Sequence, residues 1–149
     1  TVDRDIVKEV KEVDYVSGCA FLGKITVFDK IGLLNPKYFA YWEETEWCIR
    51  AKKAGFKVLN TPNSRIWHKQ FTTSNKVNGF MEYLMTRNMF WFMRTHATTK
   101  QFLSFILYFF GFEFWNRSIF LLINKKNING YKSFLKGVIN GFQLNIRDD

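Results

Sequence analysis

The chain has 149 residues, of which 47% are hydrophobic and 23% charged, so it is long enough for a sizeable core and is not a disordered tail. Its 22 Lys and Arg residues outnumber 13 Asp and Glu residues, and the resulting charge of +9 favours anionic partners such as an acidic membrane surface. No RNA-binding strand motif and no zinc-finger spacing occur, so we do not expect nucleic acid as a partner.

The N-terminal residues, TVDRDIVKEV, are charged and include no Met, so we expect neither a signal peptide nor a natural start. We expect the chain to be a fragment of a longer polypeptide. Its two cysteines, Cys19 and Cys48, are far apart, which suits a reducing compartment such as the cytoplasm.

The first part of the chain carries strand and turn signals. Residues 13–25 read as a buried strand interrupted at Ser17–Gly18, where the glycine permits a bend, a close approach to a ligand or a simple bulge. A short helix is predicted over 26–31, ended by Gly32. Short strands are predicted over 56–59 and 64–68.

A helix is predicted from Glu43 to Ala54, because its first turn is acidic, its last turn is basic and Gly55 can cap it. Helical spacing returns at residue 79, and further helical segments are predicted over 102–123 and 130–142. We therefore place a first domain at residues 1–75 and a helical, membrane-associated C-terminal region at 76–149.

The segment 102–123 raises the question of a membrane. Its longest run without a charge, residues 101–112, is about half of the roughly 20 residues that a spanning helix needs. We expect helices that lie in the membrane interface or pack on a partner, and a plain hydrophobic core fits equally well. Exposed aromatic helices would also allow a homo-oligomer.

The run from Tyr38 to Lys69 concentrates the chemistry-bearing residues, with three carboxylates and a later histidine. Glu46 is spaced to form an i,i+4 ion pair with Arg50, which is a structural role. The neighbouring aromatic rings could form a platform for a sugar or could belong to the core. His68, taken alone, is more often an ordinary half-buried histidine than a metal ligand.

Several ordered motifs over about the first 95 residues together resemble a family 2 glycosyltransferase of the rhamnosyltransferase-like type. They are VDYVSGCAFLGKITVFDKIGLLNPKYF, YWEETEWCIRAKKAGFKVL, NSRIWHK and EYLMTRN. The resemblance implies the acceptor-side half of a GT-A fold, an α/β (α+β) fragment with short strands, followed by a helical region. It also implies a cytoplasmic enzyme on the inner face of the cell membrane, acting in cell-surface polysaccharide synthesis.

Roles follow from the resemblance position by position. Glu44 matches the general base of an inverting transfer from a nucleotide-sugar donor to a saccharide or lipid-linked acceptor. Gly18, Cys19, Trp42, Glu43 and Glu46 match the acceptor site. His68 matches a ligand of Mn²⁺ or Mg²⁺ on the donor diphosphate. Arg87 would contact a phosphate or hold Glu46, and the structural role is favoured.

Two departures limit the resemblance. The usual aspartate is a glutamate at position 44. The triplet Asp3–Arg4–Asp5 lies on the wrong side of the predicted strand to be the DxD motif for the donor, so the chain contains no such motif. We therefore expect this fragment to be inactive alone. The alternative reading is a non-catalytic module for membrane docking or protein interaction, derived from such an enzyme.

Overall fold

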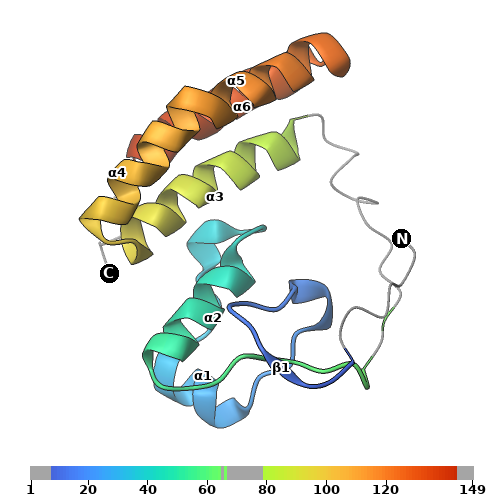
Figure 1. Cartoon of the computed structure of the whole chain (residues 1–149), viewed down its shortest axis with the longest axis vertical. Coiled ribbons are helices and arrows are strands. Elements are labelled where there is room, and N and C mark those ends of the chain that lie inside the picture. The colour runs from blue at the N-terminus through green and yellow to red at the C-terminus, as the bar shows by residue number, and fades with distance from the viewer. Residues whose placement is uncertain (1–7, 65, 67–78, 144–149) are drawn as a thin grey trace. The chain divides into compact units, whose positions relative to one another are not determined.

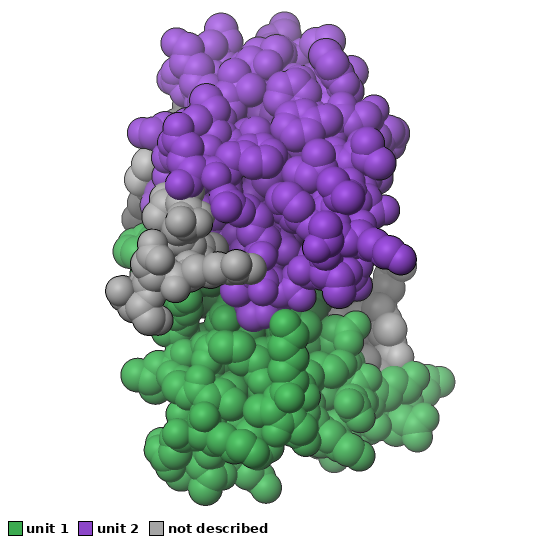
Figure 2. All heavy atoms as spheres, turned by 90° about the vertical axis from the view of Figure 1, so that its left-hand side faces the viewer, with its two compact units in different colours: residues 1–39, 43–70 green, residues 40–42, 71–149 purple. Residues whose placement is uncertain are grey.

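The computed structural model describes residues 8–64, 66 and 79–143 (Figure 1). The chain divides into two compact units, coloured separately in Figure 2. Unit 1 comprises residues 1–39 and 43–70, and unit 2 comprises residues 40–42 and 71–149.

Unit 1 is built around two short helices. Helix α1 (Ile25–Ile31) ends where Gly32 takes a positive φ of 80° and its amide returns to the carbonyl of Phe28 at 2.8 Å. Helix α2 (Glu43–Lys53) is followed by Gly55, with a φ of 88°. Single 3₁₀ turns, η1 (Gly18–Ala20) and η2 (Pro36–Tyr38), shape the loops. Both predicted helices and their terminating glycines are confirmed.

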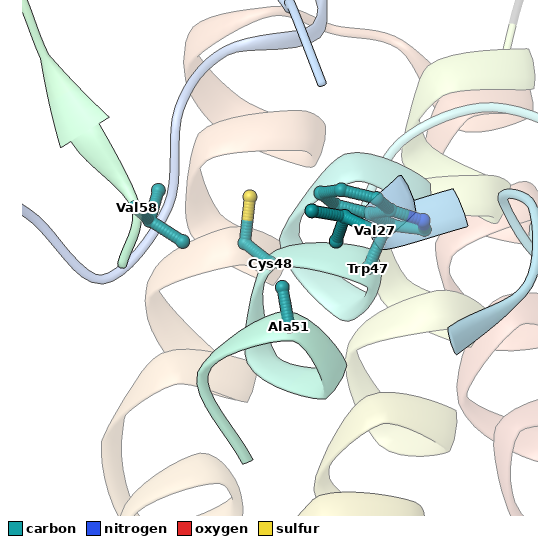
Figure 3. Close-up of a cluster of buried hydrophobic side chains, with 5 residues drawn as sticks. All are labelled: Val27, Trp47, Cys48, Ala51 and Val58. Carbon is teal, nitrogen blue, oxygen red and sulfur yellow. The ribbon is translucent and has the colours of Figure 1, made fainter. Parts of the chain in front are cut away.

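The core of unit 1 forms where one face of α2 meets α1 and the chain after α2. Figure 3 shows its buried side chains, which are Val27, Trp47, Cys48, Ala51 and Val58. The ring of Trp47 lies 4.7 Å from that of Phe28 and 5.0 Å from that of Phe21. These aromatic pairs hold the loop before α1 and the helix itself against α2.

The expected α/β architecture is wrong. Among the described residues the sheet has two strands of two residues each, β1 (Lys11–Glu12) and β2 (Leu59–Asn60), paired antiparallel with Lys11 opposite Asn60. The predicted strand over 13–25 contains η1 and loops instead. A strand must pair its backbone groups with a neighbour, and most of this segment has none, so side-chain packing decides its path. The described chain is mostly helical and is not half of a GT-A sheet fold. The predicted strand over 64–68 falls largely outside the described residues.

Unit 2 is a helical assembly in which α3 (Phe80–His96) packs along α6 (Ile128–Gln143). Glycines on α6 allow a close approach. A Cβ atom at Gly137 would lie 2.7 Å from the carbonyl oxygen of Tyr83, and one at Gly141 would lie 2.7 Å from Cβ of Phe90. The contact therefore requires residues without side chains at these two positions.

A continuous helix runs from Thr99 to Asn124 and completes unit 2 (Figure 1). Its parts are α4 (Thr99–Tyr108), α5 (Phe114–Ile119) and two π-helical stretches, η4 (Phe109–Glu113) and η5 (Phe120–Asn124). Thr98 and Gln101 form a reciprocal capping box at its start. The helix is long and apolar enough, by length and composition alone, to cross a membrane.

The long helix meets α3 and α6 through phenylalanines. Phe109 is fully buried, with its ring 4.8 Å from that of Phe90 on α3 and 6.3 Å from that of Phe134 on α6. Leu121 and Val138 belong to the same buried cluster. Some of the aromatic residues of segment 102–123 thus form an ordinary hydrophobic core, which was one of the two interpretations of this segment.

Candidate functional site

The three carboxylates occupy the first turn of α2, where the helix dipole favours negative charge. Glu43 and Glu44 are half-buried, whereas Glu46 is only 4% exposed. Their spacing prevents them from sharing one face, so each has a different environment. The three carboxylates therefore differ in their hydrogen-bond and ion-pair partners.

Glu44 faces the 3₁₀ turn η1. Its Oε1 accepts a hydrogen bond from the backbone amide of Gly18 at 3.2 Å. A Cβ atom on Gly18 would lie 3.4 Å from the same oxygen, so the turn passes close to the carboxylate. The other oxygen, Oε2, has no hydrogen-bond partner among the described residues. One oxygen is therefore fixed, while the other is buried and has no hydrogen-bond partner in this part of the chain.

Cys19 follows Gly18 in the same turn and is exposed. Its Sγ lies 3.3 Å from Oγ of Ser17, the residue before the turn. Unit 1 thus brings three predicted site residues, Gly18, Cys19 and Glu44, into one region. Cys48 is buried, and burial raises the pKa of its thiol, which leaves it a core residue rather than a nucleophile.

Glu43 is the second carboxylate with spare hydrogen-bonding capacity. Burial raises its pKa, and the neighbouring charge of Glu44 adds to that effect, while a backbone hydrogen bond opposes it. Its Oε2 also has no hydrogen-bond partner in the described part of the chain. Two adjacent carboxylates therefore offer one fixed acceptor and one group that holds its proton to a higher pH than usual.

Glu46 forms the expected ion pair with Arg50, whose Nε lies 2.8 Å from Oε1 and 3.0 Å from Oε2. The same guanidinium donates to the carbonyl oxygens of Ile31 and Leu33, the latter at 2.7 Å. Nε1 of Trp47 donates to the carbonyl of Gly32 at 2.9 Å. Glu46 therefore anchors the chain that leaves α1, and this geometry favours a structural role over acceptor binding.

Trp42 belongs to unit 2, where its ring packs at 5.1 Å on Phe92 of α3. It has a positive φ of 75°, as do Tyr41 at 66° and Phe39 at 64°, which is an uncommon conformation for bulky residues. These strained residues directly precede α2 in the sequence. Trp42 is assigned to unit 2, whereas Glu43, Glu44 and Glu46 are assigned to unit 1.

Arg87 lies on α3, and its guanidinium stacks on the ring of Trp91 at 4.0 Å. Its Nε donates to Oδ1 of Asn88 at 2.9 Å. It therefore has structural partners within unit 2, while the predicted ion pair with Glu46 stays a prediction. Contact with a phosphate stays a prediction.

Asn88 has a role that the sequence reading missed. Its buried amide donates to the carbonyls of Ala40 and Tyr41, at 2.8 and 2.7 Å, in the strained segment. The signal was present, since Leu84, Asn88 and Trp91 recur at helical spacing and place a polar amide on an apolar face. A buried amide on such a face needs polar partners, and here they are backbone carbonyls.

The metal prediction rests on a residue outside the described part, because His68 lies in the stretch 67–78. Among the described residues no group of three or more His, Cys, Asp or Glu side chains could hold a metal ion. These residues do not fit Mn²⁺ or Mg²⁺ by themselves.

Comparison with known proteins gives one informative relative. Over 82 residues the chain is 30% identical to the low-salt glycan biosynthesis hexosyltransferase Agl10 of Haloferax volcanii. The match covers 54% of this chain and 27% of the relative, so the chain spans about a quarter of that protein. No family model matches the chain, and no solved structure matches it. The similarity suggests a glycosyltransferase of glycan biosynthesis.

Proposed function

We propose that the chain is part of an inverting glycosyltransferase, of family 2 type, that builds cell-surface glycans at the cytoplasmic face of a membrane. The observation that carries the proposal is the contact of Glu44 with the amide of Gly18, which orients a carboxylate whose Oε2 is buried and has no hydrogen-bond partner among the described residues. The partial similarity to a hexosyltransferase supports the same reaction class. The donor is a nucleotide sugar, and the acceptor is a saccharide or lipid-linked hydroxyl.

In the proposed reaction, Glu44 takes the proton of the acceptor hydroxyl as its oxygen attacks the anomeric carbon. A new carbon–oxygen bond forms there, and the bond from that carbon to the donor diphosphate breaks, with inversion. The Gly18 amide holds Oε1 and so orients the carboxylate that takes the proton. Glu43, whose pKa is raised by burial, lies beside Glu44 in the first turn of α2 and is proposed to orient the acceptor.

Other parts of the enzyme are proposed to lie outside the described residues. Mn²⁺ or Mg²⁺ on the donor diphosphate would use His68 together with residues beyond this chain. The chain alone is then expected to show no transfer. A rhamnosyl donor follows only from the motif resemblance.

A second candidate is a non-catalytic module for membrane docking. The long apolar helix Thr99–Asn124 favours it, as does the absence of a metal-holding cluster among the described residues. The two candidates differ in whether Glu44 matters for sugar transfer. They agree in associating the helical unit with a membrane.

The deciding experiment is Glu44→Gln in the full-length protein, assayed for transfer from a panel of nucleotide sugars. Glutamine keeps an oxygen for the Gly18 amide but cannot accept the proton, so transfer should fall about 100-fold or more with little change in melting temperature. Glu9→Gln, at an exposed residue, is the matched control and should leave transfer unchanged. Turnover of Glu44→Gln near that of the parent would reject Glu44 as the base.

A further inference from the structure

The long helix Thr99–Asn124 has an unusual distribution of charge. Between Gln101 and Asn124 it contains two charged residues, Glu113 and Arg117, and both are half-buried. They pair with each other at 2.8 Å across one turn of the helix. The remaining positions of this stretch carry no charge, so the outward face is uncharged along about 36 Å of helix.

The outward face is apolar instead. Seven large side chains of this helix are between 50% and 75% exposed, namely Leu103, Leu107, Tyr108, Phe112, Trp115, Ile119 and Ile123. Within an apolar 18-residue stretch of the helix Thr99–Asn124, only 17% of the residues are buried inside the structure, so this is not a core helix. A helix of a water-soluble protein normally turns its polar side outward. This helix turns its ion pair partly inward and its apolar side outward.

Positive charges frame the apolar face. Lys100 lies at its start, and Lys125 and Lys126 lie just beyond its end, all exposed. The ammonium group of Lys125 lies 5.5 Å from the ring centre of Phe120, so its charge is beside the face. Anionic headgroups complement this arrangement, and exposed Trp and Tyr rings are typical of the headgroup region of a bilayer.

We propose that this outward face lies in the surface of an anionic lipid bilayer, with the helix axis in the membrane plane. The opposite face of the helix is covered by α3 and α6 through Phe90 and Phe134. Those helices carry Arg87, Arg94, Lys132 and Lys136. A spanning orientation would draw these charges to bilayer depth, which is costly, whereas an in-plane orientation leaves them in water.

The inference identifies the face and the orientation, and it does not depend on sugar transfer. It is tested by flotation of the full chain with phosphatidylcholine vesicles, with and without phosphatidylglycerol. The chain should float with the anionic vesicles. Leu107→Glu should weaken that binding at least tenfold, because a charge replaces an apolar side chain that enters the lipid. Leu33→Glu is the matched control, since Leu33 and Leu107 are both 75% exposed, and it should bind like the parent.

The contribution of charge is measured with the double variant Lys125→Gln/Lys126→Gln. At low salt its binding to anionic vesicles should fall about 30-fold, and the difference should shrink as salt rises. Equal binding of parent and double variant at low salt would contradict the electrostatic part. Equal binding of the parent and Leu107→Glu would overturn the proposal. So would a parent that stays unbound and self-associates through this face, as judged by sedimentation.

The orientation is measured with a fluorophore attached to Ser104→Cys or Asn124→Cys, at exposed positions near the two ends of the face, in a Cys19→Ala background. In the plane of the membrane, both labels should shift to shorter wavelengths on vesicles, and external dithionite should reduce both. Protection of one label alone would establish a spanning helix and overturn the in-plane orientation. None of these measurements uses transferase activity, so failure here leaves the proposed sugar transfer by Glu44 untouched.

Discussion

The backbone amide of Gly18 donates a hydrogen bond to Oε1 of Glu44 at 3.2 Å, across 26 residues of sequence. The contact fixes one oxygen of a carboxylate at the start of α2, and the 3₁₀ turn η1 supplies the amide. The carboxylate is thus oriented by a backbone group, which no substitution of a side chain removes directly. The contact can instead be tested with larger side chains at Gly18, which would push against the carboxylate.

Gly18→Ala should be tolerated, because its Cβ would meet Glu44 Oε1 at 3.4 Å, close to ordinary contact, and Gly18 has a negative φ. Gly18→Val places further methyl groups there and should displace the carboxylate. In the full-length protein, we expect near-normal transfer for Gly18→Ala and about a tenfold or greater loss for Gly18→Val. Thermal melting should change little for either, since Gly18 is exposed. Equal transfer by both variants would contradict the proposed placement of Glu44.

Arg50→Leu should destabilise unit 1 by about 3 kcal/mol, because it leaves the buried carboxylate of Glu46 without its cation. It also removes donors from the carbonyls of Ile31 and Leu33. Urea unfolding of the single variant and of Glu46→Gln/Arg50→Leu measures the effect. The double variant should recover part of the loss, since the buried carboxylate charge is gone as well. Additive losses would show that the two side chains do not interact.

Asn88→Ala should cost about 2 kcal/mol, because two carbonyls of the strained segment lose their donor. Asn88→Asp should be worse than the alanine variant, since a carboxylate cannot donate and would face the carbonyl oxygens of Ala40 and Tyr41. The comparison is made by thermal unfolding of the parent and both variants. A better tolerated aspartate would argue that the amide does not hold this segment.

Gly137→Ala and Gly141→Ala should each destabilise unit 2 by about 1–3 kcal/mol, because the new methyl group would lie 2.7 Å from an atom of α3. Gly111→Ala is the matched control, as no atom lies within 4 Å of its Cβ position. That variant should be neutral or stabilise the helix by up to about 1 kcal/mol, the usual gain from Gly to Ala. Circular dichroism melting separates these outcomes, and equal effects at the three positions would contradict the close α3–α6 contact.

The stability of the folded chain is expected to depend on pH through the carboxyl group of Glu43. Burial raises its pKa in the folded chain above its ordinary value of 4.5, so the folded state binds a proton that the unfolded state releases. Its contribution to stability is therefore present below pH 4.5 and is lost as pH rises through the folded pKa. Glu43→Gln should remove this loss and flatten the curve in that window. Urea unfolding between pH 4 and 7 checks it, with Glu9→Gln as control, and parallel curves for parent and Glu43→Gln would refute the shift.

The local signals of the sequence determined the helices. The acidic first turn and basic last turn of α2, the glycines at positions 32 and 55, and the helical spacing after residue 79 all act over a few residues, so they could be read without a fold. The Glu46–Arg50 pair followed for the same reason, because residues four apart on a helix are neighbours. The roles assigned by motif resemblance to the acceptor-site residues and to His68 stay predictions.

The tertiary structure decided what depends on distant partners. A strand exists only where another strand pairs with it, and residues 13–25 have almost none, so the expected α/β half became a mostly helical chain. The hydrogen bond between Gly18 and Glu44 joins residues 26 positions apart. The hydrogen bonds from Asn88 to the carbonyls of Ala40 and Tyr41 span 48 and 47 positions. No local sequence pattern encodes contacts over such separations. The same holds for the long helix, where only packing on α3 and α6 turned Glu113 and Arg117 partly inward and left an uncharged face outward.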